Sequence, residues 1–365
     1  MLRWPGLLAC GLVCLAVGAL EVRPGLWGAI NAADLPLPTS GYQVYMVGEL
    51  HGIAENETFA MQYLKRLHAA SGLRDVAIEE DAAYEHEAQA FVDGRLEQLP
   101  SELCLRAGVL DAIRRLNATA RAGIRVHLTD IDSPAEAIRS HLQVLAGRVP
   151  GMPSSAIPAA SDIRGHGLEA AQKLKALVRE SRDVAAIRTI EHSIRALQEG
   201  FEAGTGAGKG SPYLDDREQA VAENIIELIR IDKVPGLLVL YGDDHVSRSL
   251  RRDGGPGRNQ SFAPVALRLE QAGIKAYLLV TFPLGGSSRW RGQQGALPWT
   301  AAEGHLDSGE SLDKVLDSAP DVKYLYFGPG QHRAAVPSQD VARYLADGFL
   351  LFRSASPIKD YCAVP

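Results

Sequence analysis

The chain has 365 residues, of which 46% are hydrophobic and 22% are charged, enough apolar material for one large domain or two small ones with a proper core. Its 44 acidic residues outnumber its 38 basic residues, giving a formal net charge of −6. Because the basic residues form no block, the sequence offers no electrostatic surface for nucleic acid or anionic lipid, and we expect neither as a partner.

The first residues predict a secretory signal peptide. Arg3 precedes the apolar run 7–20, which is followed by small residues, a proline and glycines. The run is too short to span a bilayer comfortably as a helix. We expect a leader of about residues 1–30, cleaved after Ala19 or within residues 29–33, and a single domain over residues 31–365. The protein is then exported, periplasmic or secreted, without membrane attachment after cleavage; an uncleaved membrane anchor is the alternative.

Cysteines are few. Cys10 and Cys14 lie in the expected leader, so the mature chain keeps Cys104 and Cys362. One disulfide is the most that these two can form, which excludes a disulfide-rich scaffold. The sequence alone does not decide whether they pair.

Short apolar runs and helical patterns alternate along the chain. Several runs are apolar throughout, which is typical of strands covered by helices on both faces. The predicted strands are residues 42–48, 75–79, 124–128, 236–242, 275–282 and 323–327. Amphipathic patterns predict helices over 55–70 and 216–229, and a longer helical block runs from Pro134 to about Gln198. We therefore expect an α/β fold: a mostly parallel central sheet flanked by helices, with a helical insertion at about 134–212.

Titratable residues follow three of these strands. In an open α/β sheet the carboxyl ends of the strands border the crevice where ligands bind. The three segments are Gly48-Glu49-Leu50-His51, Glu79-Glu80-Asp81 and Gly242-Asp243-Asp244-His245. Two of them share the pattern Gly-x-x-His, in which we expect the glycine to allow a sharp turn of the backbone that brings the imidazole back over the sheet edge.

Any one of these groups alone would be read as a solvated loop residue, but three at one edge indicate a site. Adjacent strand residues face opposite ways, so either Glu79 or Glu80 points inward; we take Glu79. The site has two readings. His51, His245 and Glu79 are suitable ligands for a divalent metal with open positions for water. Alternatively, His51 is a general base whose tautomer and basicity are set by Glu49 or Glu79.

An arginine in the predicted helix 215–229 belongs to the same argument. Arg217 lies in the first turn, where the helix dipole disfavours a cation. A substrate carboxylate or Glu79 would explain the arginine at this position. A surface ion pair with Asp215 or Asp216 is the alternative.

These segments together resemble a known superfamily. The stretches VGELHG, VAIEED, REQAVAENI and LYGDDHVSR, which begin at residues 47, 76, 217 and 240, are similar to the motifs of erythromycin-esterase-like proteins. Their relatives include the Tiki/TraB-type proteins and the ChaN-like haem-binding lipoproteins. The resemblance covers about residues 42–282 and is weakest through the helical insertion.

The resemblance implies different chemistry for each branch. From the esterases it implies that His51 activates water for ester hydrolysis, oriented by Glu49, with Glu79, Arg217 and His245 lining the pocket. From the Tiki-type proteins it implies a metal-dependent protease with His51, His245 and Glu79 as ligands. The ChaN-like proteins bind haem and need no hydrolytic chemistry. This chain has Leu50 where a small or polar residue is expected of a macrolide esterase.

The leading interpretation is an exported hydrolase in which water attacks an ester or amide carbonyl of a small-molecule or peptide substrate. The alternative is a haem- or metal-binding uptake protein without hydrolytic activity, and a family member that has lost its chemistry is a third reading. The cofactor is accordingly undetermined between none, a divalent metal and haem. Neither the substrate nor the oligomeric state is predicted.

Overall fold

The computed structural model describes residues 18–120, 122–199, 211–252, 261–290, 293–297, 301–306, 308–328, 334–335 and 345–359. Within them, the main sheet has nine strands in the order β1-β2-β13-β15-β9-β3-β6-β4-β5. The strands from β15 to β5 are parallel to one another, and β13, β2 and β1 extend the sheet antiparallel. Their bounds are Leu20–Arg23 (β1), Leu26–Ala29 (β2), Val44–Glu49 (β3), Asp75–Asp81 (β4), Arg125–Asp130 (β5), Leu237–Gly242 (β6), Ala276–Pro283 (β9), Tyr324–Phe327 (β13) and Gly348–Phe352 (β15).

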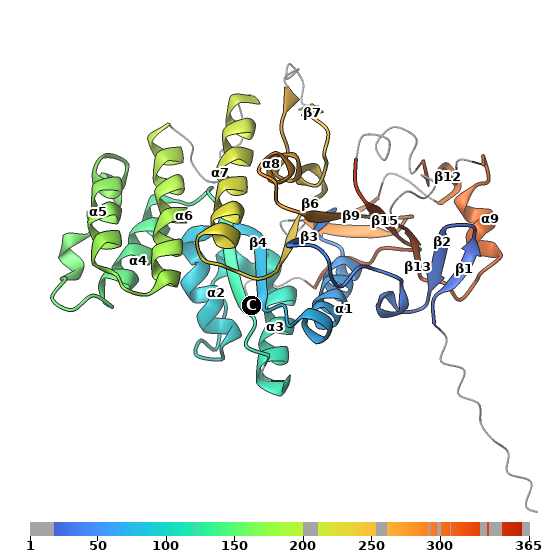
Figure 1. Ribbon diagram of the computed structural model, residues 1–365, viewed down its shortest axis with the longest axis horizontal. Coiled ribbons are helices and arrows are strands. Elements are labelled where there is room, and N and C mark those ends of the chain that lie inside the picture. The colour runs from blue at the N-terminus through green and yellow to red at the C-terminus, as the bar shows by residue number, and fades with distance from the viewer. Residues whose placement is uncertain are drawn as a thin grey trace, which may run out of the picture.

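Helices cover both faces of the sheet (Figure 1). Alternate residues of each strand point to opposite faces, so Tyr45 and Val47 pack with α1–α3 while Val44 and Met46 pack with α7–α9. The helices are α1 (Ala54–Ser71), α2 (Glu85–Val92), α3 (Ala107–Ala120), α4 (Ala135–Ala146), α5 (Ile163–Leu177), α6 (Ser181–Gln198), α7 (Ser211–Arg230), α8 (Val265–Gln271) and α9 (Leu312–Asp317). The predicted mostly parallel α/β sheet flanked by helices is confirmed.

The six predicted strands correspond to β3, β4, β5, β6, β9 and β13, with ends shifted by at most two residues. The helix expected over 55–70 is α1, and Gly72 ends it in the left-handed conformation, with φ 71°. The helix expected over 216–229 is the later part of α7. The sheet also contains β15 and the β1–β2 hairpin, which the sequence did not predict.

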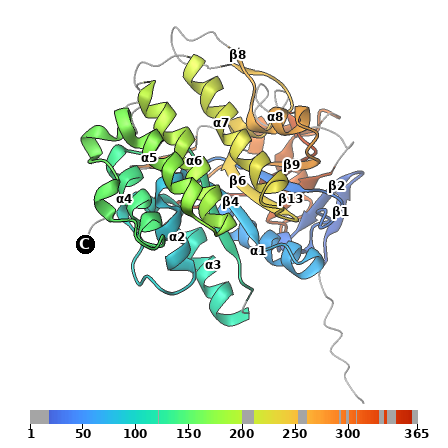
Figure 2. The same cartoon turned by 60° about the vertical axis from the view of Figure 1, so that its left-hand side comes forward.

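Helices α4, α5 and α6 pack at the β5 end of the sheet, with the β1–β2 hairpin at the opposite end (Figures 1 and 2). These helices have a hydrophobic core of their own, in which Ile138, Leu142, Leu174, Ile187 and Ile190 are fully buried. The end of the predicted insertion, residues 200–210, lies outside the described residues. The three helices are therefore a separately packed layer held against the rim of the sheet.

Two further observations concern the predicted leader and the cysteines. No helix in the described part of the chain is long and apolar enough to cross a membrane. Cys104 is disulfide-bonded. The other cysteines, Cys10, Cys14 and Cys362, lie outside the described residues, as does the apolar run up to Val17 of the predicted leader. Cys104 belongs to the 3-10 turn η3 (Ser101–Arg106), which precedes α3.

Candidate active site

The order of the strands brings the three titratable segments together. Strand β6 lies between β3 and β4, and Gly242 at its end pairs in register with Glu49 at the end of β3. His51 follows β3, Glu79 lies on β4, and His245 lies in the 3-10 turn η6 (Asp243–His245) directly after β6. The carboxyl ends of three adjacent strands thus form one edge, as expected of a parallel sheet.

The two glycines of the Gly-x-x-His segments are required by close packing. Gly242 has an ordinary φ of −57°, but a Cβ there would lie 3.1 Å from Nε2 of His51 and 3.3 Å from Oε2 of Glu79. A Cβ on Gly48 would lie 2.8 Å from Val246. The prediction that these glycines serve a sharp backbone turn is therefore replaced by a steric reason: one leaves room for the side chains of the site, and the other for η6.

His51 and Glu49 form a pair that a buried arginine completes. Nδ1 of His51 lies 3.2 Å from Oε1 of Glu49 and 3.3 Å from a guanidinium nitrogen of Arg106. Arg106, the last residue of η3, also donates a hydrogen bond to Oε1 of Glu49. Burial opposes ionisation of Glu49, but Arg106 and His51 outweigh it and lower the pKa of this carboxyl. Glu49 therefore stays ionised beside the imidazole.

The two partners of Nδ1 favour different tautomers of His51, since the Arg106 contact is a hydrogen bond only when Nδ1 is unprotonated and the Glu49 contact only when it is protonated. Arginine can only donate, and an ionised carboxylate can only accept. The Glu49 contact is a hydrogen bond when Nδ1 carries the proton, and this tautomer leaves a lone pair on Nε2, 3.5 Å from Oε2 of Glu79. The His51 side chain is 25% exposed, against 8% for His245. Of the two predicted histidines, His51 is the more accessible to a substrate.

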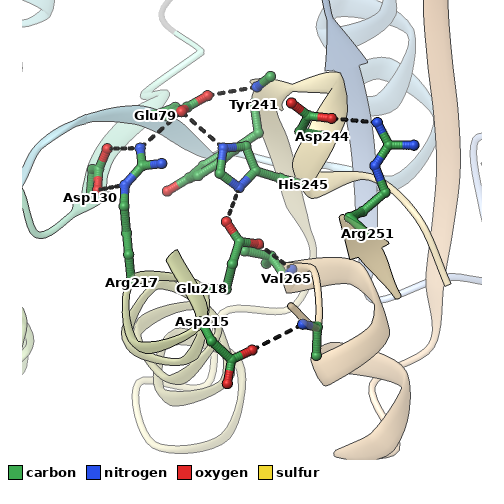
Figure 3. A network of polar contacts seen from close by, with 12 residues as sticks. Glu79, Asp130, Asp215, Arg217, Glu218, Tyr241, Asp244, His245, Arg251 and Val265 are labelled. Carbon is green, nitrogen blue, oxygen red and sulfur yellow. Dashed lines mark hydrogen bonds and ion pairs between the residues drawn. The ribbon is translucent and has the colours of Figure 1, made fainter. Parts of the chain in front are cut away.

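Glu79 is the centre of a second group of charges, shown in Figure 3. Its Oε1 accepts hydrogen bonds from Arg217 and from Nε2 of His245, both at 3.0 Å. Its Oε2 accepts from the backbone N–H of Gly242 at 2.6 Å. Burial opposes its charge, but His245, His51 and Arg217 hold the pKa of Glu79 well below its ordinary value. Glu79 is thus an ionised acceptor and not an acid.

The predicted partner of Arg217 is therefore present. Arg217 lies on α7 and contacts both Glu79 and Asp130, at 2.9 Å from its Nε to Oδ1 of Asp130 (Figure 3). Its side chain is 15% exposed, so the surface ion pair with Asp215 or Asp216 does not form. Asp215 instead accepts from the backbone N–H of Ala263 and from Arg268.

His245 is held between two carboxylates. Its Nδ1 lies 2.5 Å from Oε1 of Glu218, and its Nε2 lies 3.0 Å from Oε1 of Glu79. Glu218, which is 1% exposed, is fixed in turn by the backbone N–H of Val265 at 2.7 Å. Burial disfavours the imidazolium, but Glu218 and Glu79 outweigh it and raise the pKa of His245 well above its ordinary value. His245 is thus a fixed cation that positions Glu79.

Several residues of the site were not predicted from the sequence: Arg106, Asp130 and Glu218 as partners, and Glu57 as a neighbour. Glu80, the alternative to Glu79, also lies at the site. Oε1 of Glu80 lies 3.8 Å from Nε of Arg106, so Glu79 and Glu80 both border the site and serve different arginines. Burial, followed by repulsion from Glu49, raises the pKa of Glu57 to about 7. Glu57 therefore changes charge near neutral pH close to the Glu49–Arg106 pair.

The predicted metal ligands do not fit a metal ion. A ligating imidazole must present a free lone pair to the metal, but both ring nitrogens of His245 face carboxylates, and the charged guanidinium of Arg217 contacts the same oxygen of Glu79. No group of three or more His, Cys, Asp or Glu side chains in the described part of the chain is arranged to hold a metal. The polar groups of the site instead satisfy one another.

Comparison with known proteins agrees with this architecture. No protein-family model matches the sequence, and no curated protein is similar to it. Among solved structures, the mutant erythromycin esterase EreC in its open conformation is 12% identical, with a TM-score of 0.56 over 88% of this chain and 93% of that one. The chain has the fold of an erythromycin esterase. The resemblance expected from the short motifs is thus confirmed at the level of the fold.

Two other structures share the erythromycin-esterase fold with this chain. A Bacillus cereus protein is 16% identical, with a TM-score of 0.62 over 88% of this chain and 91% of that one. A succinoglycan biosynthesis protein is 13% identical, with a TM-score of 0.63 over 90% of this chain and 94% of that one. At such identities the likeness establishes the architecture and leaves the activity to be argued from the site.

Proposed function

We propose that this protein is a hydrolase in which His51 activates a water molecule for attack on an ester or amide carbonyl. Nε2 of His51 takes a proton from water, and the oxygen forms a bond to the carbonyl carbon. When the tetrahedral intermediate collapses, the imidazolium returns that proton to the departing alcohol or amine. This sequence of proton transfers needs no metal ion.

The arrangement around His51 supports this role. In the tautomer that donates from Nδ1 to Glu49, Nε2 is the base. The imidazolium formed during the reaction then lies between two ionised carboxylates, Glu49 at 3.2 Å from Nδ1 and Glu79 at 3.5 Å from Nε2, which stabilise its positive charge. This pairing of a partly exposed imidazole with two fixed carboxylates is the observation that carries the proposal.

Replacing His51 by asparagine tests the assignment. The amide nitrogen of asparagine lies where Nδ1 lies in histidine, so His51→Asn keeps a donor for Glu49 and removes the basic Nε2. We expect kcat on a panel of aryl and alkyl esters and peptide amides to fall by roughly 10²–10⁴-fold. The exposed His166 on α5 supplies the matched control, His166→Asn. A His51→Asn variant that retains the activity of the control would disprove the role of His51.

Elemental analysis of the purified protein separates this proposal from the other readings of the site. A hydrolase of the proposed kind is active without bound metal and is colourless. Stoichiometric zinc, manganese or cobalt that is required for activity would contradict it. Stoichiometric iron with a visible absorption band would support the haem-binding alternative instead.

We also propose that the protein is exported, with its leader cleaved after Ala19 rather than near residue 30. Strand β2 pairs with β13 inside the main sheet, and Leu26 and Ala29 are buried there. Cleavage near residue 30 would remove this strand from the sheet, whereas cleavage after Ala19 leaves β1 and β2 intact. N-terminal sequencing of the protein recovered from the periplasm or medium tests the site. The substrate is then a small molecule or peptide outside the cytoplasm.

A further inference from the structure

Residues of α2, α4 and α6 line a polar cavity that the proposed hydrolase chemistry does not use. Its volume is about 160 Å³. Ionisable side chains from all three helices and the segments after them line it: Glu85, His86, Arg95, His141, Arg148 and Asp183. Of these, Glu85, His141 and Asp183 are buried, and a buried ionisable group costs free energy unless it has a partner.

The cavity adjoins a second hollow. Arg148 and Asp183 form an ion pair, and both also line an outer hollow of about 440 Å³. The other residues of this hollow include the apolar side chains of Val149, Pro150 and Val178. The Arg148 side chain is 47% exposed and that of Asp183 is 6% exposed. The ion pair therefore lines both the polar cavity and a partly apolar hollow.

The deep wall of the cavity offers hydrogen-bond acceptors. His141 is 1% exposed, and its Nδ1 lies 3.2 Å from the carbonyl oxygen of Ala82, so Nδ1 carries the proton and Nε2 is an acceptor. Glu85 and Asp183 are also buried, at 8% and 5% exposed. A ligand that enters far enough to meet these three groups must bring N–H or O–H donors.

Cations lie beside these acceptors. Arg95 and Arg148 each use part of the guanidinium on an aspartate, Asp93 and Asp183 respectively. A guanidinium has five N–H donors in a planar fork that matches a carboxylate, so each arginine retains donors for a ligand. The cavity thus presents donors for an anionic group and acceptors for a cationic group a short distance apart.

We propose that this cavity binds a small zwitterion of the α-amino-acid class, with its carboxylate on Arg148 and Arg95, its ammonium group on Asp183 and the acceptors behind it, and an apolar side chain in the outer hollow. The ligand would replace the Arg148–Asp183 ion pair by two ion pairs of its own, so no buried charge is left without a partner. This site is distinct from the edge of the sheet that carries His51, and the proposal does not depend on the hydrolase activity.

Calorimetric titration of the mature protein with L-leucine tests the proposal. We expect a Kd below about 1 mM, the affinity that about 4 kcal/mol of binding free energy provides. Two analogues each remove one charge: 4-methylpentanoate lacks the ammonium group and isoamylamine lacks the carboxylate. Both should bind at least about tenfold more weakly, since each leaves either Arg148 or Asp183 without an ionic partner. No binding of L-leucine at about ten times that concentration, or equal binding of either analogue, would overturn the assignment.

Variants place the binding in this cavity. Ala186 on α6 lines the cavity and is 8% exposed, so Ala186→Leu fills the space without removing a polar partner and should abolish binding. Arg148→Lys keeps the charge but loses the planar fork and should weaken binding about tenfold. Lys173→Ala on α5, whose side chain is 68% exposed, is the matched control, and His51→Asn should also bind normally. Wild-type affinity in the two cavity variants, with thermal melting unchanged, would show that the ligand binds elsewhere.

Discussion

His141 should make the protein less stable in mild acid, by an amount that its surroundings allow us to work out. Burial, followed by repulsion from His86 and Arg148, lowers the pKa of His141 from 6.5 to about 3. The rings of His86 and His141 lie 4.8 Å apart, so a proton on either disfavours one on the other. In the unfolded chain His141 titrates near its ordinary value.

The sign follows from proton linkage. Between pH 6.5 and 3 the unfolded chain binds a proton at His141 that the folded chain does not, so the free energy of unfolding falls as the pH falls. The contribution of His141 is fully present above pH 6.5. By pH 5 it has lost about 2 kcal/mol, and the complete loss below pH 3 is on the order of 5 kcal/mol, at about 1.4 kcal/mol for each pKa unit.

The assay is urea denaturation at pH 7 and pH 5, followed by far-UV circular dichroism, for the wild type, His141→Asn and the exposed control His166→Asn. The asparagine amide can donate to the Ala82 carbonyl in place of Nδ1 but does not titrate. The drop in unfolding free energy from pH 7 to pH 5 should be about 2 kcal/mol smaller in His141→Asn than in the wild type. It should be unchanged in His166→Asn. An equal drop in all three proteins would refute the reasoning.

Three other substitutions have defined outcomes. Gly242→Ala places a methyl group about 3 Å from Nε2 of His51, in a backbone conformation that alanine accepts. We therefore expect kcat on the ester panel to fall by about 10²-fold with little change in the melting temperature. Normal turnover would contradict the close approach. Arg106→Met leaves Glu49 buried without its cation, so urea denaturation at pH 7 should show a loss of about 3–5 kcal/mol, and adding Glu49→Gln should restore most of it. Asp81→Asn should stabilise the protein, because burial, then Asp130 and Glu80, raise the pKa of Asp81 to about 9. The wild type therefore releases a proton at this residue when it unfolds at pH 7, and the variant should gain up to about 4 kcal/mol in free energy of unfolding. No gain would mean that Asp81 has an unrecognised ionic partner.

The strand pattern could be predicted from the sequence because buried parallel strands are apolar throughout. The residues that follow such strands lie at one edge of the sheet, independently of the conformation of the loops. Glu49, His51, Glu79 and His245 lie together at this edge for this reason. Arg217 was singled out because the sequence predicted it in the first turn of a helix, but α7 begins six residues earlier, at Ser211. Its contact with Glu79 therefore does not follow from the helix dipole.

The missed residues have no such local signal. Arg106 reaches Glu49 from 57 positions away through a 3-10 turn, and its motif-free surroundings do not distinguish it from a surface arginine. Glu218 is adjacent to Arg217, and neighbouring residues on a helix normally face different partners. Here they do so within one site, since Arg217 contacts Glu79 and Glu218 contacts His245.

Two errors concern strands. The run 348–352, which forms β15, lies beyond a polar stretch and was overlooked, although it is as long and as apolar as strands that were predicted. Strands β1 and β2 directly follow the apolar run of the predicted leader. Apolarity cannot tell the end of such a run from the start of an edge strand, so the sequence alone did not reveal β1 and β2.

The disulfide of Cys104 links the activity of the site to the redox conditions under which the protein is produced. Cys104 and Arg106 share one 3-10 turn, so the covalent bond restrains the segment from which the guanidinium reaches Glu49. A host that keeps its cytosol reducing would yield this chain uncross-linked. The oxidised and reduced proteins, which differ in mass by two hydrogens and share the same circular dichroism, should then differ in specific activity. Titration of free thiols should show which preparations contain the disulfide before any substrate is known.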